Sequence, residues 1–340
     1  MRDGTTTIII NEYGTSLRKR GKRFIICNPD RPEIEIAACK VNRIILPTKG
    51  ASVTCDALTL AMDYMIPVHV NSYSDQTTAY LANPLDHGMV SLRKAQYVES
   101  NTELGFFLAS MFIVGKIKNQ RGHLLRRARN IKKRNPKLGN HIGDTCKQIQ
   151  KIILEIDSLG HDPNGKEALF GLEGNAASLY WSAIAKLTSR EEEFTHRITR
   201  NAGDYVNRLL NYGYAILRSE VLSAIVGCGL DPFAGFLHSD RSGKPSLVLD
   251  IMEEFRAYVV DAQVCKLLLL TGGSNIEGGN DLGAPVRREL AQSILARLEK
   301  RLYDNSAMIT VKAVIRKQVE TVVSTLRTGR AFYIPFVFKW

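Results

Sequence analysis

The stretch NPLDHG, residues 83–88, decides the fold, because the hydrophobic pattern of the chain changes there. Its turn-forming residues give it the composition of a linker. Before it, short β-branched runs predict strands, and one amphipathic run predicts a helix over 55–65. The expected strands cover residues 5–11, 15–27 with a turn at Arg20-Gly21-Lys22, 33–39, 41–47, 66–71 and 77–81. We therefore expect a small β domain, sandwich-like and carrying one helix.

After the linker the apolar residues recur with helical spacing. Helices are expected near residues 90–120, 121–134, 143–158, 164–186, 203–227, 246–270, 284–303 and 306–328. The fold class predicted is α+β multidomain, with an N-terminal β domain over 1–88 and a larger all-α domain over 89–340. A length of 340 residues leaves room for both cores. The aromatic-rich residues 331–340 suit either a packed tail or a partner-binding peptide.

Composition excludes several classes of protein. No run of about 18 apolar residues occurs, and the start of the chain has no apolar signal region. A soluble, cytoplasmic protein without membrane attachment is expected. The six cysteines are scattered without C-x-x-C spacing, so we expect reduced, mostly buried thiols and no cysteine zinc site.

The net charge of +12 is concentrated in one segment. Between Lys116 and Lys137 there are ten Lys or Arg residues and no Asp or Glu. A solvated helix face is the usual explanation for such a run. Apolar residues at helical spacing within it allow one face to pack while the other displays arginines. Because no acid neutralises the field, contact with nucleic-acid phosphates is the favoured interpretation.

Three side chains suggest a metal site. Glu173 lies among small residues in GLEGNAASLYW (171–181), His238 ends GLDPFAGFLH (229–238), and Glu253 lies in the helix expected from Ser246. Two carboxylates and an imidazole suit a divalent cation. If Ser246 is the N-cap, then Asp250, Glu253 and Glu254 project from one side of that helix.

Each of these residues also has a purely structural interpretation. Acids in the first turns of a helix favour its dipole, and a lone histidine is more often structural than a ligand. Glu173 suits a buried, hydrogen-bonded acid or a surface residue, since its small neighbours would equally allow another helix to approach. Spacing alone leaves these alternatives open.

Together the motifs are more specific. The segments 171–181, 207–214 and 229–256, with GKIKNQR at 115–121, resemble CRISPR-associated protein 1, the integrase of CRISPR adaptation. The resemblance covers nearly the whole chain. It implies a homodimeric, metal-dependent DNA integrase and endonuclease that works with a small second adaptation protein, the β domain serving dimerisation or partner contact.

The resemblance also implies roles for individual residues. Glu173, His238 and Glu253 match the family's catalytic ligands for Mg²⁺ or Mn²⁺, although many members have aspartate at the position of Glu253. Glu254 competes for the third place, and Asp250 is an auxiliary acid. In the implied reaction, a DNA 3′-hydroxyl attacks a phosphodiester of the CRISPR array in line. DNA contacts are expected from Lys116, Lys118, Arg121, Arg126, Arg127, Arg129, Arg241 and Lys244.

Three alternatives remain at this point. A nuclease that uses water as nucleophile would need the same ligands but would yield only shortened products. A non-catalytic DNA-binding protein would explain the charge and bind equally without metal. A transposon-encoded relative is disfavoured because little chain follows the helical domain.

Overall fold

The computed structural model describes residues 6–10, 12–47, 49–71, 77–81, 90–160, 163–190, 194, 196–199, 202–238, 243–270, 282–304 and 307–340. The expected linker at 83–88 and the expected DNA contact Arg241 lie outside these residues. The chain separates into two compact units, Met1–His87 and Gly88–Trp340.

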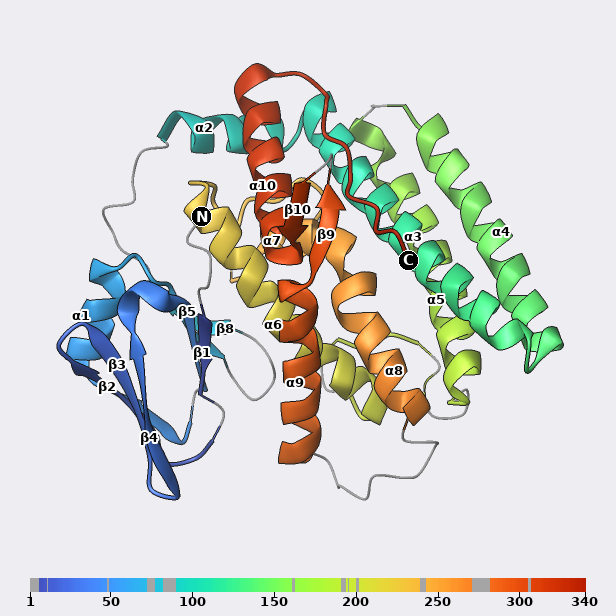
Figure 1. Ribbon diagram of the computed structural model, residues 1–340. Helices are drawn as coiled ribbons and strands as arrows, with labels where there is room; N and C mark the ends of the chain where they lie inside the picture. The colour runs from blue at the N-terminus through green and yellow to red at the C-terminus, as the bar shows by residue number, and fades with distance from the viewer. Residues whose placement is uncertain are drawn as a thin grey trace. The chain divides into compact units, whose positions relative to one another are not determined.

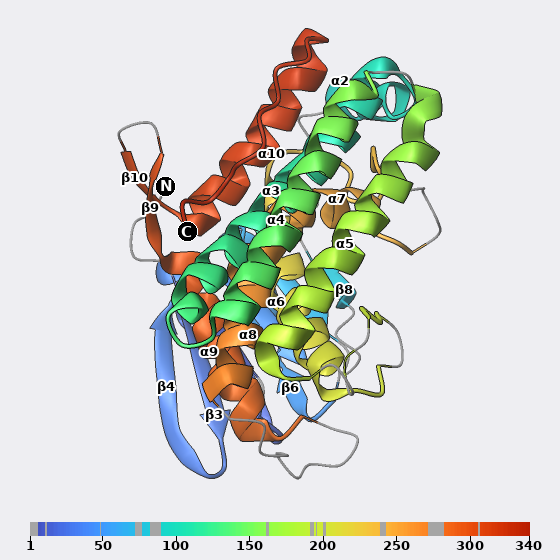
Figure 2. The same cartoon turned by 90° about the vertical axis from the view of Figure 1, so that its right-hand side faces the viewer.

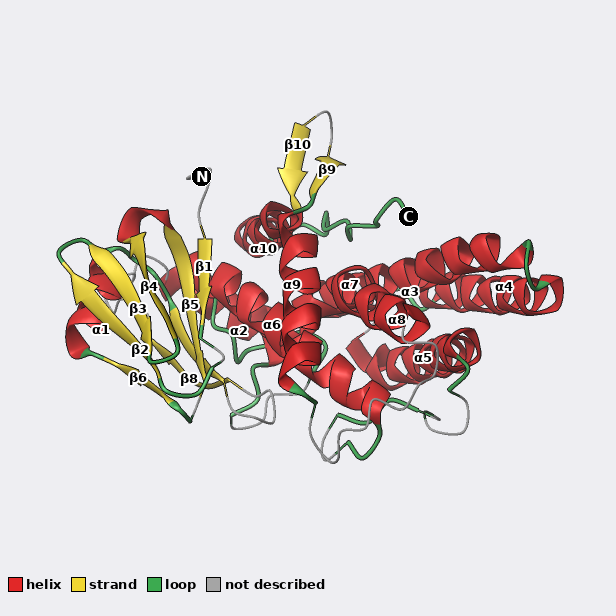
Figure 3. Cartoon of the chain, turned by 60° about the horizontal axis from the view of Figure 1, so that its bottom comes forward, coloured by secondary structure: helices red, strands yellow, loops and turns green. Residues whose placement is uncertain are grey.

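The described residues of the first unit form two four-stranded sheets, the helix α1 and a short 3-10 turn, Ala38–Lys40 (Figure 3). One sheet has the order β1-β5-β7-β8, in which only β8 is antiparallel to its neighbour. The other has the order β4-β3-β2-β6, an antiparallel meander with β6 parallel to β2. The bounds are β1 Thr6–Ile9, β2 Thr15–Arg20, β3 Arg23–Asn28, β4 Arg31–Ala37, β5 Val41–Pro47, β6 Ala51–Val53, α1 Cys55–Asp63, β7 Val68–Asn71 and β8 Thr77–Leu81.

The two sheets share one hydrophobic core. Leu17 and Phe24 from the meander pack with Ile44 and Val68 from the mixed sheet, and Leu60 of α1 closes the cluster. Burying each such side chain contributes roughly 1.5–3 kcal/mol. The sandwich-like unit with one helix is therefore confirmed. The sequence pattern missed β6, which is too short to show alternation.

The second unit is mostly helical (Figure 1). Its long helix α3 packs against α4, α5 and α7, and Figure 2 shows α3, α4 and α5 running side by side. The bounds are α2 Val90–Glu99, α3 Glu103–Lys132, α4 Pro136–Ser158, α5 Lys166–Thr188, α6 Tyr205–Gly227, α7 Ser246–Phe255, α8 Ala262–Leu270, α9 Ala284–Glu299, β9 Arg301–Asp304, β10 Ala307–Thr310 and α10 Val311–Thr328.

Two helix boundaries expected from the sequence are wrong. The break at 120/121 does not exist, and the chain breaks instead before α3, where Thr102 caps the helix by accepting a hydrogen bond from Gly105 N. α4 begins at Pro136 rather than 143, because Asn135 Oδ1 accepts from Leu138 N at 3.0 Å and proline suits a first helical turn. In both cases a capping side chain decided the boundary.

The expected helix over 246–270 is interrupted by a π-helical turn, Arg256–Asp261, which separates α7 from α8. Ser246 is the first residue of α7, and the cap position belongs to Pro245, which makes no side-chain capping bond. The unit is also not all-helical, because β9 and β10 form an antiparallel hairpin where helix ends were expected (Figure 3).

The C-terminal residues form a packed tail, the first of the two interpretations of 331–340. Tyr333 and Phe338 are almost completely buried. Among the helices of the described residues, none is both long enough and apolar enough to span a bilayer.

A series of buried hydrogen bonds crosses the helical core. Arg127 Nε donates to His123 Nε2 at 3.3 Å, so the proton of the neutral imidazole lies on Nδ1, 2.9 Å from the Tyr180 hydroxyl. Tyr180 and Tyr214 both donate to the carboxylate of Asp261. Burial, assisted by the charges of nearby arginines, lowers the pKa of His123 from 6.5 to about 3.

This low pKa predicts acid sensitivity. Below about pH 6.5 the unfolded chain protonates His123 while the folded chain does not until about pH 3, so stability falls across this window, by up to about 1.4 kcal/mol per pH unit. We expect His123→Gln to flatten the stability curve between pH 6.5 and 4, measured by urea unfolding. His141→Gln, at an exposed histidine of α4, should keep the wild-type slope. Parallel curves for all three proteins would contradict the prediction.

Candidate active site

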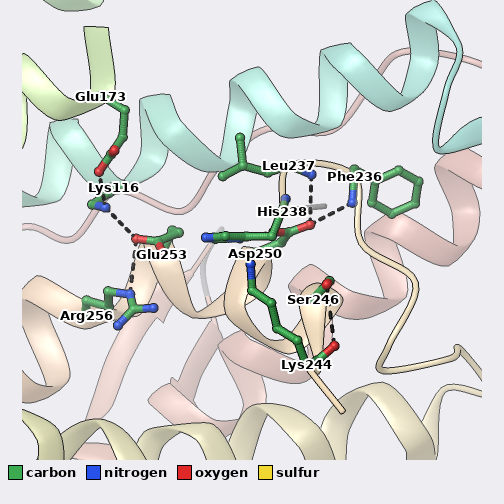
Figure 4. Close-up of polar contacts among 10 residues, drawn as sticks. All are labelled: Lys116, Glu173, Phe236, Leu237, His238, Lys244, Ser246, Asp250, Glu253 and Arg256. Atoms are coloured by element: carbon green, nitrogen blue, oxygen red, sulfur yellow. Dashed lines mark hydrogen bonds and ion pairs between the residues drawn. The ribbon is translucent and has the colours of Figure 1, made fainter. Parts of the chain in front are cut away.

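Two acids from distant helices meet at one ammonium group (Figure 4). Lys116 of α3 places its Nζ 2.5 Å from Glu173 Oε1 of α5 and 2.9 Å from Glu253 Oε2 of α7. Burial lowers the pKa of Lys116, but the two carboxylates outweigh burial and raise the pKa above its ordinary value. Lys116 therefore stays charged and holds the two acids together.

Glu253 has a second cationic partner. Arg256 Nε lies 3.1 Å from Glu253 Oε2, and the Arg256 guanidinium rests over the Tyr214 ring, 4.7 Å from its centroid. The Glu253 side chain is only 4% exposed. Burial raises its pKa, but Arg256, Lys116 and His238 outweigh burial and hold the pKa at about 2. Glu253 is thus an ionised carboxylate in a nearly water-free position.

His238 is oriented by Asp250. The fully buried Asp250 carboxylate accepts Nδ1–H of His238 at 2.6 Å and the backbone N–H groups of Phe236, Leu237 and His238 at 2.7, 3.0 and 3.1 Å. A Cβ at Gly235 would lie 2.8 Å from Asp250 Oδ2, so glycine is required for this close approach. Because Nδ1 faces Asp250, the ring presents Nε2 on its far side, and Figure 4 shows the ring pointing toward Glu253.

Glu254 points elsewhere. Its buried carboxylate accepts hydrogen bonds from the Tyr333 hydroxyl, from Phe336 N at 2.7 Å and from Gln318 Nε2 at 3.0 Å. The expectation that Asp250, Glu253 and Glu254 share one side of the helix is therefore wrong. Glu254 has no contact with Lys116 or Glu173 among the described interactions, which leaves Glu253 as the acid of α7 at the site.

The donor types at the site, two carboxylates and one imidazole, are those that suit a divalent cation. Glu253 Oε2 has two cations within ion-pair distance but no hydrogen bond of good geometry, so it is a buried oxygen with capacity for a ligand. The Lys116 ammonium acts as the positive charge between the two carboxylates. Within the described residues, no three His, Cys, Asp or Glu side chains converge closely enough to hold a metal. The ligand set Glu173, His238 and Glu253 therefore remains a prediction.

The predicted DNA contacts differ in how far their side chains are exposed. Arg126 and Arg129 are exposed near the C-terminal end of α3. Arg121 Nε donates to Cys146 O, and Arg127 bonds His123 and Ala262 O, so these side chains are occupied by internal contacts. Lys116 is held by the acids, whereas Lys118 and Lys244 are partly buried. Among the described members of this predicted set, Arg126 and Arg129 are thus the fully exposed ones.

Sequence reasoning missed the role of Arg256. It follows Glu253 by three residues, which is the spacing at which helical side chains meet, so that signal was present. The only role predicted for Lys116 was a DNA contact, because nothing in the sequence links α3 to Glu173.

The family model described as CRISPR associated protein Cas1 matches residues 8–271. The chain belongs to the Cas1 family. A protein of Archaeoglobus fulgidus named CRISPR-associated endonuclease Cas1 is 32% identical over 98% of this chain and 95% of its own length. A protein of the same name from Francisella tularensis subsp. novicida is 30% identical over 98% of this chain and 99% of its own length.

Solved structures share the fold. A casposase bound to an integration product superposes with a TM-score of 0.79 at 22% identity, covering 97% of this chain and 93% of that one. A Cas1 protein from Thermotoga maritima superposes with a TM-score of 0.73 at 20% sequence identity, covering 98% of this chain and 99% of that one. These likenesses extend the Cas1 fold to both units described above.

The Asp250 cluster predicts a stability defect. Asp250→Asn removes the charge that accepts three backbone N–H groups and the imidazole, and hydrogen bonds to charged groups contribute about 1.5–3 kcal/mol each. We expect a loss of at least about 2 kcal/mol in urea unfolding. Glu320→Gln, which breaks an exposed pair with Arg316, should change stability little. Equal stability of the two variants would contradict this account of the loop.

Proposed function

We propose that this chain is a metal-dependent DNA integrase and endonuclease of CRISPR adaptation. The observation that carries the proposal is the meeting of Glu173 and Glu253, from separate helices, at one cation. Membership of the Cas1 family and the endonuclease names of its relatives support it. Its likeness in fold to a casposase that was solved bound to an integration product supports it as well.

Glu173, Glu253 and the Nε2 of His238 are the groups that would hold Mg²⁺ or Mn²⁺. The bound ion would polarise a phosphodiester and stabilise the charge that develops on its oxygens. Asp250 fixes the tautomer of His238, because Nδ1 must donate and Nε2 then keeps its lone pair. Arg256 stabilises the ionised form of Glu253, so this ligand needs no deprotonation at neutral pH.

The reaction proposed is a transesterification. The 3′-oxygen of an incoming DNA end forms a bond to phosphorus as the existing 3′-oxygen leaves, and the hydroxyl proton is transferred through solvent to the leaving oxygen. Once the two carboxylates have another counter-charge, the Lys116 ammonium becomes available to a DNA phosphate, the role predicted from its sequence.

DNA would be held by its phosphates without reading of sequence. Arg126 and Arg129 are exposed on α3 and supply that charge, and Lys244, with Arg241, follows His238 in the chain. We also propose a homodimer in the cytoplasm, without membrane attachment, in which the β-rich unit serves dimerisation or partner contact. A small second adaptation protein is the expected partner, and a solved Cas6-RT-Cas1–Cas2 complex contains a chain that has this fold over 37% of its length, with a TM-score of 0.79 at 17% identity.

A nuclease that uses water as its nucleophile is the second candidate function. It would use the same three ligands, and the endonuclease names of the relatives favour it. The two reactions differ in their products, since joining gives branched DNA and hydrolysis gives only shortened strands.

Replacing Glu173 tests the site. We expect Glu173→Ala to abolish joining of labelled DNA ends in Mn²⁺, because one of the two acids at the cation is lost. Glu167→Ala, at an exposed acid on the same helix, should retain wild-type activity. Branched products from Glu173→Ala would overturn the assignment, whereas shortened products alone from the wild-type chain would favour the nuclease.

The exposed arginines predict the salt dependence of DNA binding. Replacing both Arg126 and Arg129 by glutamine removes two phosphate contacts, so the slope of log K against log salt should fall by about 2. Filter binding to unrelated duplexes would measure it, and the weakening should be uniform across sequences. Arg121→Gln, at an arginine bonded to Cys146 O, is the matched comparison and should change the slope less. An unchanged slope in the double variant would show that α3 is not part of the DNA-binding surface.

A further inference from the structure

Residues 330–340 form an extended segment that lies along α3, and we call it the C-terminal strap (Figure 1). Tyr333 and Phe338 are buried in the helical core, whereas Phe332 is exposed. The Phe338 ring stacks on Tyr258 with centroids 3.8 Å apart, and the Trp340 ring stacks on His123 at 5.1 Å. The strap is therefore anchored along its length.

One face of α3 is shaped to receive the strap. Gly115, Asn119 and Gly122 recur at helical spacing. A Cβ at Gly115 would lie 2.8 Å from Pro335 Cβ, and one at Gly122 would lie 2.3 Å from Trp340. Asn119, fully buried between them, donates to Phe336 O at 2.8 Å and accepts from Phe338 N at 2.8 Å.

The strap also forms hydrogen bonds to α7 through the Glu254 carboxylate. This carboxylate is completely buried, and two of its donors, the Tyr333 hydroxyl and Phe336 N, belong to the strap. Asn119 Nδ2 donates at 3.0 Å to the backbone oxygen of Glu254 as well. The strap thus bonds a side chain of α3, Asn119, and a side chain of α7, Glu254.

These links lie next to the candidate active site. Glu254 directly follows Glu253, and Asn119 lies one helical turn beyond Lys116. The two helices approach closely here, since a Cβ at Gly115 would be only 2.7 Å from Glu254 Cγ. Any movement of α7 relative to α3 at this point would change the distance between Glu253 and Lys116.

We propose that the C-terminal strap is a positioning segment of the active site, in which Tyr333 and Phe336 hold Glu254 and thereby fix Glu253 relative to Glu173 and His238. Its catalytic consequence rests on the proposed function. Among the described interactions, the strap has none with Glu173, His238 or Glu253, so it acts on the site through α7. A partner that displaced the strap would release Glu253 without contacting it.

The test uses Tyr333→Phe in the full chain. This variant deletes the hydroxyl that donates to Glu254 and keeps the ring, whose edge packs on Phe112 at 5.3 Å. Ile334→Ala is the matched control, because Ile334 is the next strap residue and is 77% exposed. Amide hydrogen exchange in metal-free protein would report the order of α7, and Mn²⁺ titration followed by electron paramagnetic resonance would report the affinity of the site.

We expect Tyr333→Phe to accelerate exchange of the amides at 251–255 by about tenfold or more. It should weaken Mn²⁺ binding by about tenfold or more and lower kcat of joining with little change in KM for DNA. Ile334→Ala should match the wild type in each measurement. Wild-type exchange of these amides in Tyr333→Phe, or wild-type Mn²⁺ affinity at a site that Glu173→Gln abolishes, would overturn the proposal.

Failure of the proposed function has a different signature. If Glu173→Gln leaves Mn²⁺ binding unchanged, the acids do not form the metal site. The exchange rates of α7 then decide the strap proposal by themselves, since they require neither metal nor DNA.

Discussion

The ionised carboxylate of Glu253 is the constraint around which the helical unit is organised. A nearly buried charge is costly unless cations compensate it, and removal of one partner from such a group typically costs about 3–5 kcal/mol. Lys116 approaches from α3, Arg256 from the turn after α7, and Tyr214 supports Arg256 from α6. Four separate elements must therefore be in register before this one side chain is stable.

Helix α7 uses its three acids in three directions. Asp250 orders the loop that carries His238, Glu253 faces the cation shared with Glu173, and Glu254 is bonded to the C-terminal strap. Glu253 is the acid placed at the candidate active site, and the bonds of Asp250 and Glu254 fix its position. This division explains why a short helix can carry three carboxylates in a buried setting without mutual repulsion dominating.

Sequence reasoning succeeded where the signal is local. Alternation in β2 and β3 and helical periodicity after residue 88 gave the two units, whereas the shared site of Glu173, His238 and Glu253 stays a prediction. It failed where side chains act across the fold. The caps Thr102 and Asn135 set helix starts that periodicity does not contain, and the pairing of Lys116 with Glu173 joins residues 57 positions apart. The direction of Glu254 depended on a tail whose docking no spacing rule describes.

The π-helical turn Arg256–Asp261 has a consequence for how this chain tolerates insertions and deletions. A π turn holds one more residue than an α turn, and each helical residue rotates the following face by about 100°. Loss of one residue from this turn would therefore convert it to an α turn and keep α8 in phase with α7, whereas loss of a residue from α7 or α8 would rotate the following face by that angle. Within this run of helix, the six-residue segment is therefore the place where a shorter chain is tolerated best.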